Sequence, residues 1–222
     1  NGKAHCVVLE YGDKSLHDFL KRGPLQRNER KFIVDRLAHI VQHLHAMNVV
    51  HCDLKPHNFV LFGLKWKVID LENARRAGEP VSMRVSPSYC SPELARAVLS
   101  KQTDRMRAAC ALDMWAFGLI VFELFARQPF FSDKPDTMQQ LASYAELEVP
   151  KDVVDDIQAR HMLKKVLVKN HLDRASVQAI LKHAYLCGGM DTIQRESSFG
   201  YLQQTQTQLQ SLLAEVSAQI RT

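Results

Sequence analysis

Residues 111–127 constrain the fold most, because nearly all of their side chains are apolar. A surface helix keeps a broad polar face, which this segment lacks, so we expect a helix that is buried almost all round, with Asp113 near its start. Its longest apolar run, residues 114–122, is much shorter than the ~20 residues that cross a bilayer. The sequence therefore predicts a buried core helix and no membrane span.

The composition is that of a soluble globular protein. The 222 residues are 46% hydrophobic and 24% charged, which excludes a disordered tail, a collagen-like fibre and a membrane bundle. This length suits one domain, or one and a half. The net charge is +5, but the basic residues are scattered and form no stripe with aromatic residues. We therefore expect no nucleic-acid partner.

The cysteines favour a reducing compartment. There are five, an odd number, and no two are spaced like the ligands of a metal knuckle. No signal peptide opens the chain, which begins with Asn1. We expect an intracellular, cytoplasmic protein, and we interpret these residues as part of a longer chain.

Further helices are expected from periodicity and end signals. The clearest covers residues 28–48, from Asn28 as the cap to Asn48 as the end, because its apolar residues recur every three or four positions. These residues are Ile33, Leu37, Ile40, Leu44 and Met47. The other expected helices are residues 15–21, 137–146, 152–169 and 176–186.

Short strands are expected at residues 6–11, 59–62 and 66–69. The last two are joined through Gly63, which indicates a β-hairpin. Residues 71–93 form a long connection without clear periodicity, and loops of this length are often functional.

Residues 201–222 are predicted to form an amphipathic helix after a break at Gly188 and Gly189. Its apolar face consists of Leu202, Leu209, Leu212, Val216 and Ile220. This pattern is shorter than the roughly three or four heptads that indicate a coiled coil. A helix packed on the domain is the first interpretation, and a dimerisation segment or a lead into another domain is the alternative.

Four polar residues around the hairpin suggest chemistry. Asp53, Lys55 and Asn58 precede it, and Asp70 follows it, so the returning chain can bring Asp70 opposite Asn58. Carboxylate and amide oxygens suit Mg²⁺, a lysine can neutralise phosphate, and Asp53 remains to accept a hydroxyl proton. Each residue alone is more often a turn former or a solvated side chain. Together they match phosphoryl transfer, which depends on positioning and charge neutralisation.

At this point the sequence resembles the eukaryotic protein kinase family over residues 6–186. The catalytic loop is matched by His51-Cys52-Asp53-Leu54-Lys55-Pro56-His57-Asn58, the Asp-Phe-Gly motif by Asp70-Leu71-Glu72, the Ala-Pro-Glu motif by Ser91-Pro92-Glu93, and the start of the central helix by Asp113. The resemblance implies a mainly α-helical large (C-terminal) lobe with a few short β-strands, followed by the C-terminal amphipathic helix. It also implies that Arg174 pairs with Glu93.

The resemblance implies a serine/threonine protein kinase that uses ATP and Mg²⁺ and acts on a protein substrate. Asp53 would orient or deprotonate the substrate hydroxyl, and Lys55 would steady the transferring phosphate. Asn58 and Asp70 would hold Mg²⁺. Ser86, within a segment similar to Gly-Thr-Pro-x-Tyr, would bond to Asp53 and Lys55.

The resemblance also implies an adenine site. Leu9 would be the gatekeeper, the backbone of Glu10 and Gly12 would meet the base, and Val60 would form the floor.

The resemblance covers only part of a kinase. The sequence contains no glycine-rich loop, strand lysine or partner glutamate of a small lobe. We interpret residues 1–12 as the hinge with the last small-lobe strand, 13–187 as the large lobe and 188–222 as a helical extension. The small lobe is expected upstream in the same chain, and residues 1–222 alone are predicted to be inactive.

Two departures from the family pattern raise alternatives. Glu72 replaces the motif glycine, so its carboxylate would either add a metal ligand or repel nucleotide phosphates. Cys52 replaces an arginine that, in the family, often binds a phosphate on the activation loop. A phosphoserine there would lack this charge-assisted partner, so phosphorylation of Ser82, Ser86 or Ser88 is not expected to be the main switch of activity.

Cys52 and the histidines of the helix expected at residues 28–48 are interpreted as structural residues. Cys52 is interpreted as a small apolar filler rather than a redox group. His39 and His43 have zinc-ligand spacing, but a polar helix face that also includes His45 is the default interpretation.

Two alternatives to the enzyme remain. The first is a pseudokinase or scaffold module, with weak or no phosphoryl transfer, favoured by Glu72 and the missing small lobe. The second is an interaction domain that binds a partner through residues 201–222.

Overall fold

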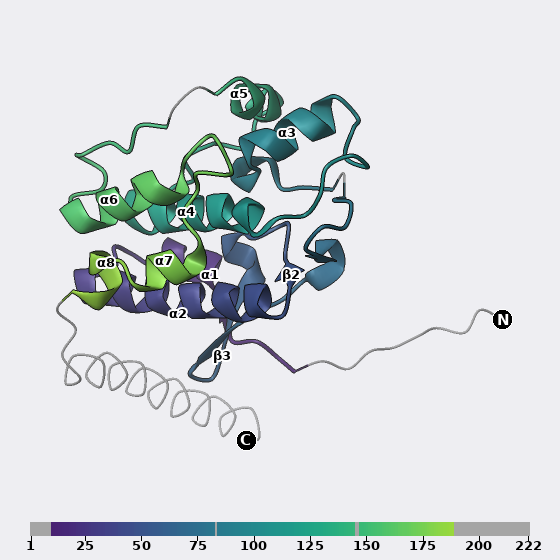
Figure 1. The fold of residues 1–222 in the computed structure, drawn as a ribbon. Coiled ribbons are helices and arrows are strands. Elements are labelled where there is room, and N and C mark those ends of the chain that lie inside the picture. The colour runs from purple at the N-terminus through teal and green to yellow at the C-terminus, as the bar shows by residue number, and fades with distance from the viewer. Residues whose placement is uncertain (1–9, 83, 145–146, 189–222) are drawn as a thin grey trace, which may run out of the picture.

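The protein is organised around one buried helix. The computed structural model describes residues 10–82, 84–144 and 147–188, and helix α4 (Cys110–Ala126) runs through their centre (Figure 1). Every residue from Leu112 to Leu124 is buried. The predicted core helix is therefore confirmed. It ends where Arg127 adopts a left-handed conformation with φ of 64°.

Helices surround α4, and strands are short and few. The helices are α1 (Leu16–Lys21), α2 (Arg27–Ala46), α3 (Pro92–Leu99), α5 (Thr137–Ser143), α6 (Ile157–Val166), α7 (Val177–Leu181) and α8 (Ala184–Cys187). The strands are β1 (Lys14–Ser15), β2 (Val49–Val50), β3 (Phe59–Phe62), β4 (Lys65–Val68) and β5 (Arg75–Arg76). The mainly α-helical fold class is confirmed.

The first two helices begin at reciprocal side-chain caps. The Ser15 hydroxyl accepts the Asp18 N–H at the start of α1, while the Asp18 carboxylate accepts the Ser15 N–H. Helix α2 starts at Arg27, because the Glu29 carboxylate accepts the N–H of Gln26. The prediction of Asn28 as its cap was therefore wrong.

The predicted hairpin is confirmed, with its second strand beginning at Lys65. Strands β3 and β4 pair antiparallel from Phe59 opposite Val68 to Phe62 opposite Lys65. Gly63 begins the two-residue turn with φ of 60°, a value that glycine adopts without steric cost. Strand β1 pairs with the other side of β3, which ties the start of the described chain to the hairpin.

Strand β5 pairs with β2 and returns the chain beside the start of the polar loop, residues 51–58. Strand β5 lies within the predicted long connection, where a strand of two residues leaves no periodic signal. The same connection contains the 3₁₀ turns η2 (Leu71–Asn73) and η3 (Pro87–Tyr89).

Several predicted boundaries differ from the structure. Glu10 and Tyr11 are not in a strand, and α5 ends at Ser143. Helix α6 starts only at Ile157, where the Asp156 side chain caps it, and a break at residues 182–183 separates α7 from α8. Residues 6–9 and the predicted helix 201–222 lie outside the described residues.

Helix α3 was missed, although its start carries a sequence signal. Ser91 caps the helix through its hydroxyl, and Pro92 occupies the first turn. Both residues favour a helix start at these positions.

Among the described residues, no helix is long and apolar enough to cross a membrane.

Gly118 allows α6 to approach α4 closely. A Cβ atom at this position would lie 2.7 Å from side-chain atoms of Val166 and Leu167. We expect Gly118→Val to lower the free energy of unfolding by about 2–3 kcal/mol through overpacking, measured by urea denaturation. Ala97→Val on α3, outside the buried core, is the control and is expected to change it by less than about 0.5 kcal/mol. Equal effects of both variants would contradict this interpretation.

Candidate active site

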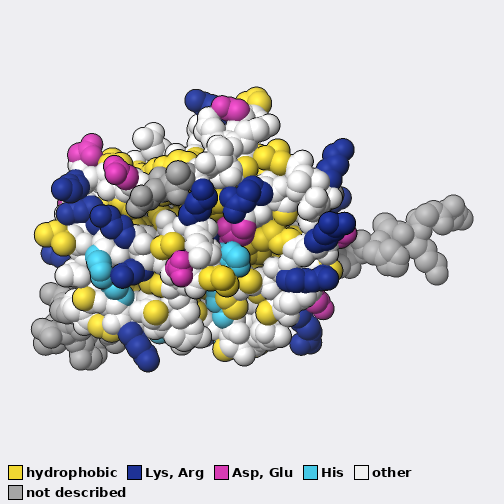
Figure 2. Space-filling model, turned by 45° about the horizontal axis from the view of Figure 1, so that its top comes forward, with side chains coloured by type: hydrophobic (Ala, Val, Ile, Leu, Met, Phe, Trp, Pro, Cys, Tyr) yellow, Lys and Arg dark blue, Asp and Glu magenta, His cyan; other side chains and the backbone are white. Residues whose placement is uncertain are grey.

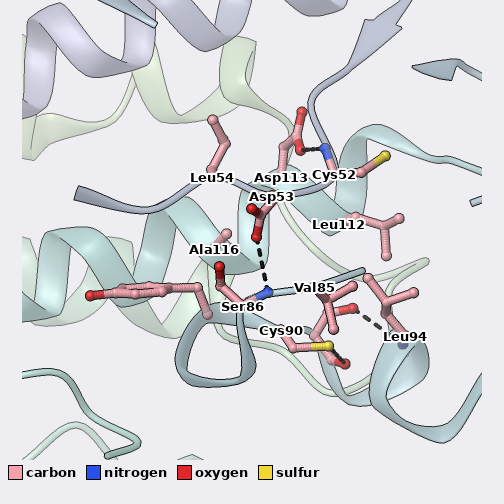
Figure 3. A pocket seen from close by; sticks show the side chains of 12 residues that line it. Cys52, Asp53, Leu54, Val85, Ser86, Cys90, Leu94, Leu112, Asp113 and Ala116 are labelled. Atoms are coloured by element: carbon pink, nitrogen blue, oxygen red, sulfur yellow. Dashed lines mark hydrogen bonds between the residues drawn. The ribbon is translucent and has the colours of Figure 1, made fainter. Parts of the chain in front are cut away.

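The Asp113 carboxylate holds the polar loop that precedes the hairpin. Asp113 is 1% exposed at the start of α4. Its two oxygens accept the backbone N–H groups of His51 and Cys52, each at 2.9 Å (Figure 3 shows the bond to Cys52). Cys52 has φ of 66°, a left-handed conformation that costs a non-glycine residue about 1–3 kcal/mol. The buried carboxylate therefore stabilises a strained backbone next to Asp53.

The imidazole of His51 fixes the same loop from within. It is fully buried; its Nδ1 lies 3.3 Å from the Asp53 N–H and its Nε2 lies 3.1 Å from the Ile69 carbonyl. These partners require a proton on Nε2. The ring thus links the start of the polar loop to the residue before Asp70.

Asp53, Lys55 and Ser86 are joined in a closed triangle of hydrogen bonds. Lys55 Nζ donates to Asp53 Oδ2 at 3.0 Å and to Ser86 Oγ at 3.1 Å. The Ser86 N–H donates to the other Asp53 oxygen at 3.0 Å, the contact drawn in Figure 3. The Asp53 side chain is 8% exposed and that of Lys55 is 24% exposed. Both carboxylate oxygens of Asp53 are therefore oriented, one by Lys55 of the same loop and the other by Ser86 of the long connection.

Asn58 and Asp70 stand at the same end of the hairpin. The Ile69 N–H donates to the Asn58 carbonyl at 2.9 Å, which extends the β3–β4 ladder by one pair. Asn58 Nδ2 donates to the Asp53 carbonyl at 3.0 Å, so Oδ1 is the amide atom that can coordinate a cation. Asp70 is exposed and left-handed, with φ of 64°. An amide oxygen and one carboxylate fit Mg²⁺, which is usually bound by one or two carboxylates together with substrate phosphates.

Of the residues predicted to contact adenine, the structure describes Glu10, Gly12 and Val60. A Cβ on Gly12 would lie 2.4 Å from Val60 Cγ1, so the backbone at Gly12 passes directly against the predicted adenine floor. The Glu10 side chain is bonded to Lys67 Nζ on β4. Leu9 lies outside the described residues.

The side chains of Arg174 and Glu93 form a bidentate pair. Their nitrogen and oxygen atoms are 2.8 and 3.2 Å apart, and the Arg174 side chain is fully buried. Arg174 also donates to the Val168 carbonyl and covers the Trp115 ring at 5.1 Å. The pair anchors the start of α3 to α4 and to the loop before α7.

The Glu72 carboxylate is directed to Arg84 of the long connection. Arg84 Nη1 lies 2.8 Å from Glu72 Oε1, and both side chains are more than half exposed. Exposed pairs of this kind contribute about 0–1 kcal/mol. The geometry favours an ion pair with Arg84 over a Glu72 metal ligand.

Two buried polar contacts were missed in the sequence. The Tyr89 hydroxyl donates to Glu123 on α4 at 2.6 Å, and Glu123 is 4% exposed. Glu123 is the one charged residue among residues 114–126, and this was the signal, because a buried charge needs a partner. His45 Nε2 lies 3.0 Å from Asp113 with its side chain 4% exposed, so its assignment to a polar helix face was wrong.

The alternative readings of Cys52 and of the histidines have little structural support. Burial, and to a smaller extent the nearby Asp113 carboxylate, raises the pKa of the Cys52 thiol to about 12. The thiol is therefore protonated at neutral pH, which opposes a redox role that needs a thiolate. His39 is exposed and bonded to the backbone of Asp35 in its own helix. Within the described part of the chain, no three potential ligands among His, Cys, Asp and Glu cluster as a metal site.

On the face in Figure 2, Lys and Arg side chains stand in separate groups rather than in one stripe.

The comparisons with known proteins agree with this arrangement. Residues 1–186 match the protein kinase domain family. The chain is 24% identical over 184 residues to serine/threonine-protein kinase MPS1 of Encephalitozoon cuniculi, covering 83% of this chain and 31% of that protein. It is 28% identical over 205 residues to serine/threonine-protein kinase PLK2 of Mus musculus, covering 86% and 28%. Dual specificity protein kinase TTK of Mus musculus is 28% identical over 194 residues, covering 81% and 22%.

The chain belongs to the eukaryotic protein kinase family. The matched region and the mainly α-helical fold correspond to the large lobe of this family. The chain spans about a third or less of the length of these relatives.

The pH dependence of stability tests the buried Glu123. Burial raises the pKa of this carboxyl by more than the Tyr89 hydrogen bond lowers it. The folded protein thus binds the Glu123 proton more tightly than the unfolded chain does. Protonation of Glu123 therefore stabilises the folded state at low pH, and this contribution to the free energy of unfolding is lost as the pH rises through the folded-state pKa. Urea unfolding between pH 4.5 and 8 should show Glu123→Gln gaining stability relative to wild type as the pH rises.

Tyr89→Phe provides the second arm of this experiment. It removes the hydrogen bond that lowers the Glu123 pKa, so the loss of stability with rising pH should extend to a higher pH than in wild type. Parallel pH profiles for wild type and Glu123→Gln would contradict the shifted carboxyl.

Proposed function

We propose that this chain is the large lobe of a serine/threonine protein kinase that transfers the γ-phosphate of ATP to a protein hydroxyl when its small lobe is present. The observation that carries the proposal is the triangle of Asp53, Lys55 and Ser86, in which one carboxylate is held by the activation segment. A turn-forming aspartate would not need both oxygens oriented in this way. The kinase relatives support the same class of reaction.

Asp53 is proposed to orient the substrate hydroxyl and accept its proton as the oxygen attacks the γ-phosphorus, while the bond from that phosphorus to the bridging oxygen breaks and ADP leaves. Lys55 is proposed to neutralise charge on the transferring phosphoryl group, since its ammonium already lies 3.0 Å from Asp53. Ser86 positions both side chains from the activation segment. Holding these groups before the substrate arrives reduces the entropic cost of the reaction.

Asn58 and Asp70 are proposed to hold Mg²⁺, and Gly12 and Val60 to contact adenine together with Leu9 and Glu10. Bound Mg²⁺ would supply neutralisation of the phosphate charge. The small lobe is proposed to be provided in the same protein, upstream. A membrane partner or a nucleic-acid partner is not part of this proposal, and a helix-mediated partner at residues 201–222 stays a secondary prediction.

A pseudokinase is the second candidate, and the observation that favours it is Glu72 beside Asp70. The contact with Arg84 weakens this argument, because it directs the carboxylate to the activation segment. We therefore favour the enzyme.

Asp53→Asn tests the proposed reaction. In the full-length protein with ATP, Mg²⁺ and a generic serine/threonine substrate, we expect this variant to lose about 10²- to 10⁴-fold in kcat, because the proton acceptor is removed. Residues 1–222 alone should give no transfer above background. Wild-type protein that transfers no phosphate with any divalent metal would instead support the pseudokinase.

Glu72→Gly tests whether the altered motif matters. We expect the phosphate-transfer rate of the full-length variant to stay within about fivefold of wild type, since the exposed ion pair contributes at most about 1 kcal/mol. Arg84→Gln is the matched control for the same contact and should behave alike. A hundredfold loss in Glu72→Gly, with Arg84→Gln near wild type, would assign Glu72 a direct role at the metal site.

A further inference from the structure

The net positive charge of the chain is concentrated in its last described segment. Residues 157–188, which contain α6, α7 and α8, carry six Lys and Arg residues against the single acidic residue Asp173. This excess of five equals the net charge of the entire chain, so the remaining residues are balanced. Most of the excess comes from four exposed lysines, Lys164, Lys165, Lys169 and Lys182.

Helix α6 presents part of this charge on the same face as an apolar side chain. Ile157, His161 and Lys165 are exposed at intervals of one helical turn. Nδ1 of His161 lies 2.7 Å from Nε2 of His183, the residue that caps α8. The Lys165 charge acts on the same ring, because burial lowers the pKa of His183 most, followed by His161 and Lys165. The exposed side of α6 is therefore continuous with the start of α8.

The loop after α6 adds a further lysine and a second apolar side chain. This loop returns to the helix where the Ala175 N–H donates to the Lys165 carbonyl at 2.9 Å. Within it, Lys169 is exposed and Leu172 is 80% exposed, while Ile157 at the other end of α6 is 71% exposed. We call this exposed set the α6 face, which consists of Ile157, His161, Lys164, Lys165, Lys169 and Leu172.

The two carboxylates that adjoin the α6 face in the sequence already have partners. Asp156 accepts two backbone N–H groups at the start of α6 and pairs with Arg27 at 2.9 Å. Asp173 accepts the Asn170 amide at 2.8 Å. Among the described residues, no carboxylate forms an ion pair with a lysine of the α6 face. The face therefore offers its ammonium groups to a ligand from outside the described residues.

The α6 face lies away from the candidate active site. In Figure 1, α6 and α8 stand on the side of the molecule opposite β2, which leads into the loop with Asp53. Figure 2 shows Lys and Arg side chains gathered around a histidine at the left, the side on which Figure 1 places α6. A partner bound there would leave Asp53 accessible.

Charge and exposed apolar side chains select among the possible occupants. A second copy of the chain would bring the same lysines together in a two-fold contact, which repulsion opposes. Residues 189–222 contain three acidic and two basic residues, which is too little negative charge to match the face. A nucleic acid would match the charge through its phosphates, but it would leave Ile157 and Leu172 in water. An acidic protein segment with an apolar residue matches both features.

We propose that the α6 face docks an acidic segment of a partner protein, in which carboxylates flank an apolar side chain. The lysines neutralise the carboxylates, and Ile157 and Leu172 contact the apolar side chain. This inference goes beyond the proposed kinase function and does not depend on it, because the face shares no residue with the candidate active site.

Fluorescence anisotropy of labelled peptides measures this docking on the full-length protein. The probe peptide has one Leu between two runs of four Glu, and the comparison peptides carry Gln in place of every Glu or Ser in place of Leu. We expect the Kd of the probe peptide to be at least about tenfold lower than that of the Gln peptide and about threefold lower than that of the Ser peptide. High salt should remove the first difference, because it screens exposed charges.

Charge reversal on the α6 face is compared with the same reversal elsewhere. The face variant should raise the Kd of the probe peptide at least about tenfold, and it combines Lys164→Glu, Lys165→Glu and Lys169→Glu. The control variant should stay within about threefold of wild type, and it reverses exposed lysines on other elements through Lys65→Glu, Lys101→Glu and Lys134→Glu. Circular dichroism checks that both variants fold. If the face variant does not fold, the corresponding triple Gln variant is used and should raise the Kd about threefold.

Four outcomes would overturn the inference. Equal weakening by the face and control variants would assign the binding to the overall charge of the protein. Equal Kd values for the probe and Ser peptides would remove the apolar contact. Tighter binding of a single-stranded oligonucleotide of equal charge, lost in the face variant, would assign the face to nucleic acid. Tighter binding to vesicles that contain phosphatidylserine, lost in the same variant, would assign it to a membrane surface.

Discussion

The buried carboxylate of Asp113 is the interaction on which the site depends. It lies 1% exposed at the start of the central helix and accepts two consecutive backbone N–H groups from the loop that carries Asp53. A buried charge is stable only with well-placed donors, so the carboxylate and the loop fix one another. Removing these bonds would free Cys52 from its left-handed conformation and release the loop from the core.

The same helix organises the other functional elements. Toward its start, the Arg174 guanidinium donates to the carbonyl of Ala111 and joins Glu93 to the helix, and further along Glu123 receives the Tyr89 hydroxyl. These contacts hold the segment with Ser86 in front of Asp53. The loop with Asp53, the segment with Ser86 and α3 are therefore positioned by polar groups on one apolar helix, and both of its charged residues, Asp113 and Glu123, are buried.

Local patterns in the sequence predicted much of this fold, but not all of it. The apolar segment, the α2 periodicity and the Gly63 turn carry their own signals, and each corresponds to an observed element. The strands β2 and β5 have two residues each, and only their pairing defines them. Helix α2 starts at Arg27 because the Glu29 side chain accepts the N–H of Gln26. In the sequence, Gln26 and Asn28 are both candidate cap residues, and composition does not rank one above the other.

The sequence alone determined the helix at the core, the hairpin and the string of polar residues from His51 to Asn58, because these depend on local propensity and spacing. Only the tertiary structure decided which side chains meet. It brought His45 to Asp113, Tyr89 to Glu123, Arg84 to Glu72 and His17 to His57. Three of these pairs join different structural elements and the fourth lies within the long connection, so their contacts follow from how the chain packs rather than from any local pattern.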